Sequence, residues 1–368
     1  MHCKQLVSLS VASLMLAAVL TGCGGASSTA SSAASEAGSE AASKITKVAL
    51  TCDTGTIDDE SFNQACWSAV SSYMGDDCQY YIPEADASDE DRETMIRQAV
   101  NDGAEVIVCV GYLYGASLAW AAEQYPDVKF VAIDVTQGDI GTDEIPSNCY
   151  CITFKEEQAG YLAGYAIAKD GKTKLGFLGG MAVPAVIRYG YGFVQGADAA
   201  AKELNEKVEM NYSWQYGANF NASPELQTMA AGWYQTGTEV IFACGGSMFA
   251  SISAAAAAEE GKVVGVDVDQ SGESTTVITS AMKGLADSAQ WALGKFYAGE
   301  FASIGGVQTS LGANENAVGL PTATWSLTKW SVDSYKVMLQ DIKDGKIAID
   351  NNYDNLASTE NVTLNIVG

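Results

Sequence analysis

The stretch CDTGTIDDESFNQACW, residues 52–67, gathers side chains that could do chemistry within one short span. They comprise four acids, an aromatic ring and an amide: Asp53, Asp58, Asp59, Glu60, Phe62 and Asn63. A cluster of this kind suits three uses, which are holding a metal ion, acid–base catalysis and gripping a polar ligand. The rest of the sequence decides among them.

A metal site is the first use, and the spacing of the acids argues against it. Nucleoside hydrolases hold calcium with D-x-D-P-G-x-D-D, and aligning its last pair with Asp58 and Asp59 places Cys52 and Thr54 where the leading acids belong. Calcium takes roughly six to eight oxygen ligands, many from carboxylates. Cys149 and Cys151 form a lone C-x-C with no zinc spacing around it. We therefore expect no metal site.

Catalysis is the second use, and the sequence lacks its usual groups. The only histidine, His2, lies in an N-terminal segment that we expect to be removed. The chain has no G-x-S-x-G and no P-loop, and GYGFVQG (190–196) misses the dinucleotide fingerprint by one residue. We expect neither an enzyme nor a bound cofactor.

Ligand binding is the third use, and it fits the order of the residues. IDDESFNQ is typical of a helix start, so at least one of Asp58 and Asp59 is expected to cap the helix. Phe62 beside Asn63 would offer a flat apolar face next to an amide that both donates and accepts. The alternative for Phe62 is a place in the core.

Buried strands alternating with helices must position these residues. The strand candidates are the apolar runs KVALTCD, AEVIVCVG, VKFVAID, KLGFLGG, EVIFACGG and KVVGVDVDQ. Helical spacing marks ESFNQACWSAVSSYM, SDEDRETMIRQAVNDG, EEQAGYLAGYAIAKD, PAVIRYGYGFVQGADAAAKEL and SPELQTMAAGWYQTG. Near-continuous apolar strands joined by helices predict an α/β fold with doubly wound parallel sheets.

A weak internal repeat divides these elements into two sets. NDGAEVIVCVG (101–111) aligns without a gap with QTGTEVIFACG (235–245). KFVAID and KVVGVD follow them, and KVALTC and KLGFLG precede them, in the same order. Chance similarity between α/β units is the alternative, but the ordered series favours two lobes of like fold.

Polar residues and glycines stand at the carboxyl ends of the predicted strands, where open parallel sheets bind ligands. In the first lobe these are Asp53, Gly111, Tyr112 and Asp134; in the second they are Gly179–Met181, Gly245–Ser247, Asp267 and Asp269. Each alone is ordinary turn chemistry. If the lobes face each other, the two sets converge on one cleft.

The N-terminus predicts export and a lipid anchor. Residues 1–22 carry an apolar run from Leu6 to Leu20, typical of a signal peptide, and Thr21 and Gly22 before Cys23 resemble a lipobox. Residues 23–44 are a Ser/Ala/Gly-rich flexible linker behind that lipidated cysteine. We expect an extracytoplasmic protein anchored to the cell membrane through Cys23; an ordinary signal peptide is the alternative.

Charge and cysteine content exclude further classes of protein. The net charge of −25 repels phosphate backbones, so we expect no nucleic-acid partner. Seven cysteines remain once Cys3 is removed and Cys23 is lipidated, and Cys52, Cys109 and Cys244 lie in apolar strand patterns that favour buried thiols. A disulfide among the seven stays open.

From Lys47 onward the chain resembles the Bmp-type substrate-binding lipoproteins, or purine nucleoside receptors, of ATP-binding-cassette importers. The motifs that carry the resemblance are DTGTIDDESFNQ, GY at 111–112, YPDVKFVAID, FKEEQAGYLAGY, LGFLGGMAVPAVIRYGYGFVQGA, GVDVDQ, VITSAMK and DIKDGKI. They cover nearly the whole mature chain. Glu60 stands where relatives usually have Lys, and relatives are often basic whereas this chain is acidic.

The resemblance implies a type I periplasmic-binding-protein fold with a hinge of several crossovers. The expected N-terminal lobe is 45–153 plus about 281–308, and the C-terminal lobe is 154–280 plus about 309–368. A purine nucleoside would be clasped between the lobes and passed to permease subunits in the membrane. We expect the protein to act as a monomer.

The resemblance also implies a role for individual residues. Phe62 and Phe220 would stack on the two faces of the base, with Trp214 or Tyr216 as alternatives to Phe220. Asn63 and Asp134 would address the base edge. Asp267 would accept from the ribose hydroxyls, with Lys283 beside the sugar. The remaining expected ligand-binding residues are those at strand ends: Asp53, Tyr112 and Gly245.

Several alternatives stay open. The same fold could bind another small polar ligand, such as a sugar or an autoinducer, and a tethered protein could instead contact neighbouring cells. Lys283 could merely balance Asp267 or Asp269. Nucleotides are expected to bind poorly, because the sequence offers one candidate cation for the cleft and no phosphate-binding loop.

Overall fold

The computed structural model describes residues 47–84, 86–213 and 219–367. The described residues all belong to one compact unit, Ile45–Gly368. The expected signal peptide, the expected lipid site at Cys23 and the linker lie outside the described residues. Within the described part, no helix is both long enough and apolar enough to cross a membrane.

Ten α-helices are described in this unit. They are α1 (Phe62–Met74), α2 (Asp89–Asn101), α3 (Gly115–Gln124), α4 (Gln137–Ile140), α5 (Glu156–Lys169), α6 (Pro184–Leu204), α7 (Pro224–Gln235), α8 (Met248–Ala258), α9 (Leu285–Tyr297) and α10 (Val332–Lys343). Three short 3-10 helices are η1 (Tyr112–Tyr114), η2 (Gln270–Gly272) and η3 (Phe301–Ser303).

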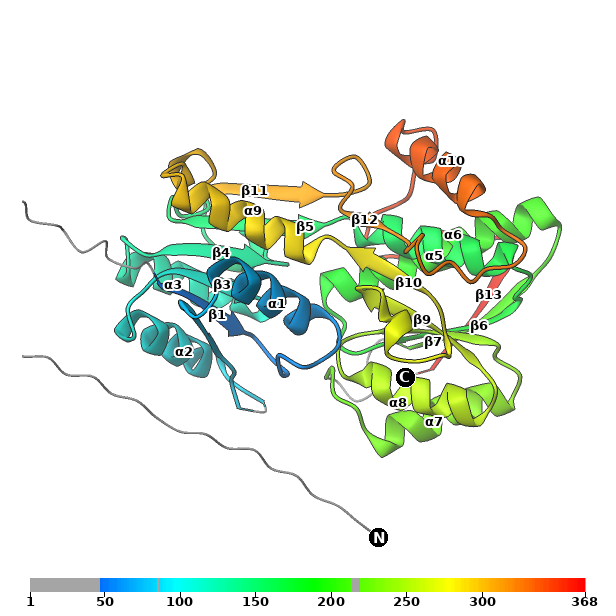
Figure 1. Cartoon of the computed structure of the whole chain (residues 1–368). Helices are drawn as coiled ribbons and strands as arrows, with labels where there is room; N and C mark the ends of the chain where they lie inside the picture. Colours follow the sequence, from blue (N-terminus) through cyan, green and yellow to red (C-terminus); the bar gives the residue numbers. More distant parts are fainter. Residues whose placement is uncertain (1–46, 85, 214–218, 368) are drawn as a thin grey trace, which may run out of the picture. The chain divides into compact units, whose positions relative to one another are not determined.

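Two sheets organise the described elements (Figure 1). The first is wholly parallel, in the order β11-β5-β4-β3-β1-β2. Its strands are β1 (Lys47–Cys52), β2 (Cys78–Tyr81), β3 (Ala104–Val110), β4 (Lys129–Ile133), β5 (Cys149–Phe154) and β11 (Val307–Leu311). We call this sheet and its helices the first lobe.

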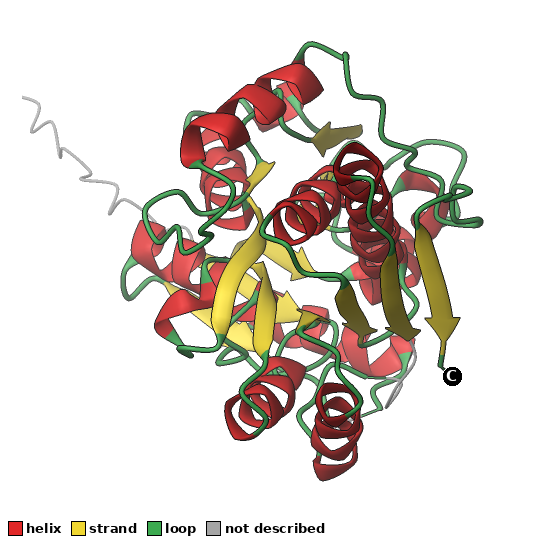
Figure 2. Cartoon of the chain, turned by 90° about the vertical axis from the view of Figure 1, so that its right-hand side faces the viewer, coloured by secondary structure: helices red, strands yellow, loops and turns green. Residues whose placement is uncertain are grey.

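The second sheet has the order β12-β10-β9-β8-β6-β7-β13, with β12 antiparallel to β10 and the other pairs parallel. Its strands are β6 (Lys174–Gly179), β7 (Val208–Ser213), β8 (Val240–Cys244), β9 (Lys262–Asp267), β10 (Val277–Lys283), β12 (Val318–Gly319) and β13 (Val362–Ile366). Helices flank the strands on both faces (Figure 2). We call this sheet and its helices the second lobe.

The strand orders confirm the predicted repeat. The first sheet contains β5-β4-β3-β1-β2 and the second contains β10-β9-β8-β6-β7, which is the same order of consecutive strands. The aligned segments 101–111 and 235–245 supply β3 and β8, which lie inside their sheets. The α/β doubly wound fold is therefore as expected, and each lobe brings its strand ends to one edge.

The chain passes between the sheets three times. It leaves the first sheet after β5, returns after β10 through α9 to β11, and crosses again from β11 to β12. This agrees with a hinge of several crossovers. The residue limits of the two lobes, 45–153 plus about 281–308 and 154–280 plus about 309–368, stay a prediction.

Glycines bring α5 and α6 into backbone contact in the second lobe. A Cβ added at Gly164 would lie 2.0 Å from the carbonyl oxygen of Phe193, and one at Gly196 would lie 2.0 Å from that of Tyr161. Gly160 and Gly192 are equally tight against the facing backbone. These helices therefore hold the residues at their N-terminal ends in a fixed relation.

The cysteines behave mainly as small apolar residues. Cys52, Cys109 and Cys244 are buried in their strands, as predicted. All seven cysteines within the described ranges have free thiols. Burial raises the pKa of the Cys109 thiol to about 12, so this group stays protonated and unreactive.

Candidate ligand-binding site

A cavity of about 920 Å³, including its opening to solvent, lies at the carboxyl ends of strands from both sheets. It is lined by residues that follow β1, β3 and β4 in the first lobe and β6, β8 and β9 in the second. All nine predicted ligand-binding residues line it: Asp53, Phe62, Asn63, Tyr112, Asp134, Phe220, Gly245, Asp267 and Lys283. Their contacts with a ligand remain a prediction.

Two glycines at equivalent places of the repeat make room at the strand ends. Gly111 follows β3 with φ +116°, and Gly245 follows β8 with φ +150°. A Cβ at Gly111 would lie 2.1 Å from the Asp53 carboxyl group, and a Cβ at Gly245 would lie 2.6 Å from the Phe220 ring. Neither position accommodates a larger residue without moving a cavity-lining side chain.

Two aspartates at the next equivalent places adopt the left-handed conformation. Asp134 follows β4 with φ 62°, and Asp267 ends β9 with φ 66°. This conformation is uncommon outside glycine and costs roughly 1–3 kcal/mol when the surroundings impose it. Asp267 is buried and the Asp134 side chain is 9% exposed, and both line the cavity, so in each lobe an unfavourable backbone conformation directs one carboxyl group into the cavity.

Asp53 is fixed by the loop after β3. Its carboxylate accepts a hydrogen bond from the Leu113 backbone N–H at 2.9 Å, and its carbonyl oxygen accepts from Arg92 Nε at 3.1 Å. Burial raises the pKa of the Asp53 carboxyl group to about 7, although the Leu113 hydrogen bond opposes that shift. Asp53 therefore forms part of the cavity wall, and its carboxyl group is partly protonated near neutral pH.

The opening cluster starts α1, as predicted. The Asp59 carboxylate accepts from the backbone N–H groups of Ser61, Asn63 and Gln64, each at 3.0 Å, and so caps the helix. Asp58 is exposed. The capping prediction is confirmed for Asp59, and this cap sets the direction of the next two side chains.

Those two side chains are Phe62 and Asn63. Asn63 Nδ2 donates to the Thr54 carbonyl at 2.9 Å, which fixes the amide orientation. Its Oδ1 is buried and accepts no hydrogen bond from the described residues. Phe62 is partly buried; it packs against the core and also lines the cavity, and its contact with a ligand stays a prediction.

Phe220 brings a second ring to the cavity from the other lobe. It lies against Gly180 and Gly245 at the ends of β6 and β8. Its carbonyl oxygen accepts from the Met248 backbone N–H at 2.9 Å, which ties it to the start of α8. Trp214 and Tyr216, the alternatives to Phe220, lie outside the described residues.

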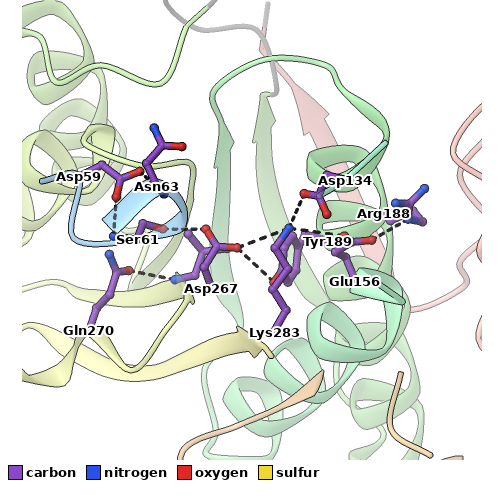
Figure 3. Close-up of polar contacts among 11 residues, drawn as sticks. Asp59, Ser61, Asn63, Asp134, Glu156, Arg188, Tyr189, Asp267, Gln270 and Lys283 are labelled. Carbon is purple, nitrogen blue, oxygen red and sulfur yellow. Dashed lines mark hydrogen bonds and ion pairs between the residues drawn. The ribbon is translucent and has the colours of Figure 1, made fainter. Parts of the chain in front are cut away.

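Lys283 is the centre of a buried charge network (Figure 3). Its Nζ lies 2.5 Å from Asp134 Oδ2, 3.5 Å from Glu156 Oε1 and 3.8 Å from Asp267 Oδ1. It also lies 4.6 Å from the centre of the Phe62 ring. Burial lowers the pKa of Lys283, but the carboxylates outweigh burial and raise it overall, so the ammonium stays charged.

Lys283 does lie near Asp267, but its nearest partner is Asp134 of the first lobe, and its contact with a sugar stays a prediction. Asp269 has other partners, because its carboxylate accepts from the Ser271 backbone N–H and from Thr324 Oγ1. Burial raises the pKa of the Asp134 carboxyl group to about 6, and Lys283 limits the rise. Burial also raises the pKa of Asp267.

Three members of this network were not predicted from the sequence. Glu156 begins α5 and is fully buried, with its Oε2 at 2.8 Å from Arg188 Nε. Arg188 and Tyr189 come from the first turns of α6 and line the cavity, with the Tyr189 hydroxyl 3.5 Å from Asp267 Oδ1. The expectation of one cation in the cleft is therefore wrong, since Arg188 is a second. Glu156 follows the end of β5, and this position could have marked it.

Two further hydrogen bonds join the lobes beside the cavity, in addition to the one between Lys283 and Asp134. Ser61 Oγ donates to Asp267 Oδ2 at 2.7 Å, and Gln270 Nε2 donates to the Glu60 carbonyl oxygen at 2.9 Å. Both connect the start of α1 in the first lobe with the segment after β9 in the second. The lobes therefore touch through side chains that a ligand could compete for.

Groups of three or more His, Cys, Asp or Glu side chains able to hold an ion do not occur in the described ranges. The lining carboxylates are engaged with Lys283, Ser61 and backbone N–H groups instead.

Comparison with known proteins identifies the family of this chain. Residues 45–353 match the family model described as Bmp, ABC transporter substrate-binding protein PnrA-like. The chain belongs to the Bmp family. Members of this family are substrate-binding proteins of ABC transporters and not enzymes, which agrees with a cavity built for binding.

Relatives of this Bmp-family chain span almost its whole length. It is 28% identical to an ABC transporter nucleoside-binding protein, BmpA, of Lactococcus lactis, over 94% of this chain and 99% of the relative. It is 28% identical to a CD4+ T-cell-stimulating antigen of Listeria monocytogenes, over 94% and 98% respectively.

Solved structures support the fold. An ABC transporter solute-binding protein of Aeropyrum pernix superposes with a TM-score of 0.71 at 21% identity, covering 84% of this chain and 95% of the other. The two-lobed fold of solute-binding proteins, expected from the sequence resemblance, is confirmed.

Proposed function

We propose that this Bmp-family protein binds a purine nucleoside in the cavity between its lobes and delivers it to the permease of an ABC importer. The observation that carries the proposal is a pair of buried acceptors beside an aromatic ring. Asn63 Oδ1 and Asp134 Oδ1 accept no hydrogen bond from the described residues, and Phe62 lines the same cavity.

Buried acceptors without donors are costly, so a ligand that supplies donors gains affinity there. A purine base has N–H donors at its edge and two apolar faces. Phe62 from the first lobe and Phe220 from the second would cover those faces, and stacking adds about 0.5–1.5 kcal/mol per face beyond burial. The base would then tie the lobes together.

The sugar would lie toward Asp267 and Lys283. A carboxylate can accept from both hydroxyls of a cis-diol, and Asp267 already accepts from Ser61 Oγ. A ribose hydroxyl would replace or join that serine. Loss of one hydroxyl would leave a buried carboxylate short of a partner, so 2′-deoxynucleosides should bind less tightly.

The relative from Lactococcus lactis bears the name of a nucleoside-binding protein, which supports the same ligand class for this chain. We also propose that Cys23 carries a lipid and that the protein works outside the cytoplasmic membrane as a monomer. Hinge closure around the ligand, and not bond breaking, would be its action.

A thermal-shift screen of the mature protein tests the ligand class. We expect inosine, guanosine and adenosine to raise the melting temperature, 2′-deoxyinosine to raise it less, and ribose to leave it unchanged. Stabilisation by ribose or another sugar, with none from purine nucleosides, would replace the nucleoside with a sugar as the ligand.

A further inference from the structure

Lys283 faces three carboxylates at unequal distances. Two of their oxygens, Asp134 Oδ1 and Glu156 Oε1, accept no hydrogen bond from the described residues, which leaves the ammonium a second acceptor to move to. Its nearest acceptor is Asp134 Oδ2 at 2.5 Å, which belongs to the other lobe. Glu156 Oε1 lies 3.5 Å away and accepts no hydrogen bond from any described group. Lys283 itself is buried, with 6% of its surface exposed.

Glu156 is held ready by the second lobe. Its Oε2 lies 2.8 Å from Arg188 Nε, so the side chain cannot rotate freely. It begins α5, where the helix dipole favours a negative charge. The close backbone contact of α5 with α6 fixes Glu156 relative to Arg188. Glu156 Oε2 is therefore paired with Arg188, and Oε1 faces Lys283 (Figure 3).

The proposed ligand creates a competition for Asp134. A base donor that bonds to the unpaired Asp134 Oδ1 draws negative charge from the same carboxylate and so weakens its hold on the Lys283 ammonium at Oδ2. A buried ammonium needs an acceptor, because its desolvation is costly when unpaired. Asp267 is 3.8 Å away and already accepts from Ser61. Glu156 Oε1 is nearer and has no donor within the described part of the chain.

We propose that Glu156 is a positioning residue that receives the Lys283 ammonium when a nucleoside takes Asp134. The Asp134–Lys283 pair then acts as a contact between the lobes that the ligand replaces. Lys283 pairs with Glu156 inside the second lobe, beside the sugar. This inference rests on the proposed function, and it assigns a role to a residue that need not touch the ligand.

A double-mutant cycle in the mature protein tests the role. Glu156→Gln keeps the shape of the side chain, Asp134 and Asp267 still balance Lys283, and Asp134 and Glu157 still act on Arg188, so the variant should fold. We expect the dissociation constant for inosine to rise about 10-fold, the scale of one hydrogen bond to a charged group. Glu203→Gln, at an exposed ion pair with Lys169, is the matched control and should change nothing.

The decisive comparison measures the effect of Glu156→Gln in a protein that already carries Lys283→Met. If Glu156 acts through Lys283, then Glu156→Gln should have almost no further effect on affinity once Lys283→Met is present. A purely structural role would give the same loss in both backgrounds, and that result would overturn the inference. Unchanged affinity in Glu156→Gln alone would overturn it as well.

A crystal structure of the unmodified protein with inosine provides a measurement that does not depend on any variant folding. We expect Lys283 Nζ within hydrogen-bonding distance of Glu156 Oε1 and farther from Asp134 than before. An ammonium still bonded to Asp134 would contradict the inference while leaving nucleoside binding intact. If the unmodified protein binds no nucleoside, the proposed function fails, and the same distance is measured with the compound that the thermal-shift screen identifies.

Discussion

At the scale of single residues, the cavity combines groups of opposite character. Phe62 supplies an apolar face, and Lys283 lies 4.6 Å from the centre of that ring. Asp134 and Asp267 supply carboxylates held by strained backbone. An uncharged ligand with a flat base and a hydroxylated sugar satisfies both kinds of surface, whereas a plain apolar ligand would leave the acceptors unpaired.

Removing the Phe62 ring tests the stacking surface. We expect Phe62→Ala to raise the dissociation constant for inosine about 10-fold or more, because it loses the stacking and the apolar burial of one face. Calorimetry measures this directly. Tyr73→Ala, on the same helix at a side chain that is 42% exposed, should bind as the wild type does. Equal affinity for both variants would remove Phe62 from the site.

The buried carboxyl groups predict how stability depends on pH. Burial raises the folded-state pKa of Asp53 to about 7 and that of Glu157 to about 7, above their values in the unfolded chain. Between about pH 4 and 7 the folded state then binds more protons than the unfolded state, so stability falls as pH rises. The net charge of −25 acts in the same direction.

We therefore expect the free energy of unfolding in urea to be lower at pH 7.5 than at pH 5.5, by on the order of 1–3 kcal/mol. Asp53→Asn can still accept from the Leu113 N–H and should reduce this pH dependence. A stability that rises between these two pH values, or an unaltered slope in the variant, would refute the assignment.

At the scale of elements, the contact between α5 and α6 positions Glu156, Arg188 and Tyr189. The side-chain-free faces of Gly164 and Gly196 allow the two backbones to meet. Any Cβ there would force the helices apart and shift the residues at their N-terminal ends. Packing far from the cavity thus governs geometry within it.

Gly196→Ala tests this contact, because its Cβ would lie 2.0 Å from the Tyr161 carbonyl oxygen. We expect the free energy of unfolding to fall by about 1–3 kcal/mol or more. Gly232→Ala in α7 is the matched control, since no atom of the described residues would lie within 4 Å of its added Cβ. That change should stabilise the protein by roughly 0.5–1 kcal/mol through helix propensity. Equal effects at the two sites would contradict tight packing.

At the scale of the whole molecule, acids outnumber cations around the cavity. Asp53, Asp59, Asp134, Asp139 and Asp267 line it, against Arg188 and Lys283. Glu156 forms an ion pair with Arg188 and so neutralises much of the positive charge of its guanidinium group. Together with the net charge of −25, this arrangement favours uncharged ligands over anions.

We expect inosine 5′-monophosphate to bind at least about 10-fold more weakly than inosine, because its phosphate meets repulsion that Arg188 and Lys283 do not offset. Competition calorimetry at low and high salt measures the difference, which should shrink as salt screens the charges. A nucleotide that binds more tightly than its nucleoside would show that Arg188 serves as a phosphate site.

Much of this arrangement could be predicted from the sequence, because parallel sheets bind ligands at their strand ends. Asp53, Asp134 and Asp267 each follow an apolar strand run, and that rule placed them at the ligand-binding edges of their lobes, whereas the clasp of the two lobes around one ligand was implied by the family resemblance. The repeat of 101–111 and 235–245 predicted two like lobes, since each copy carries a complete strand and its turn glycine.

The missing parts have physical reasons. Glu156 stands at a helix start, where an acid is indistinguishable in sequence from a capping residue. The pairing of Lys283 with Asp134 joins residues 149 positions apart in different lobes, and sequence spacing carries no record of it. The sequence predicts a helix that contains Arg188 but not its place in the cavity, because only the packing of α6 directs this side chain inward.

Isothermal titration calorimetry of the wild-type mature protein with inosine, against ribose as the comparison ligand, tests the central claim most directly. We predict one binding site per chain for inosine, with a dissociation constant of about 1 μM or lower, and no measurable heat with ribose. Absence of inosine binding, or tighter binding of ribose than of inosine, would contradict the account.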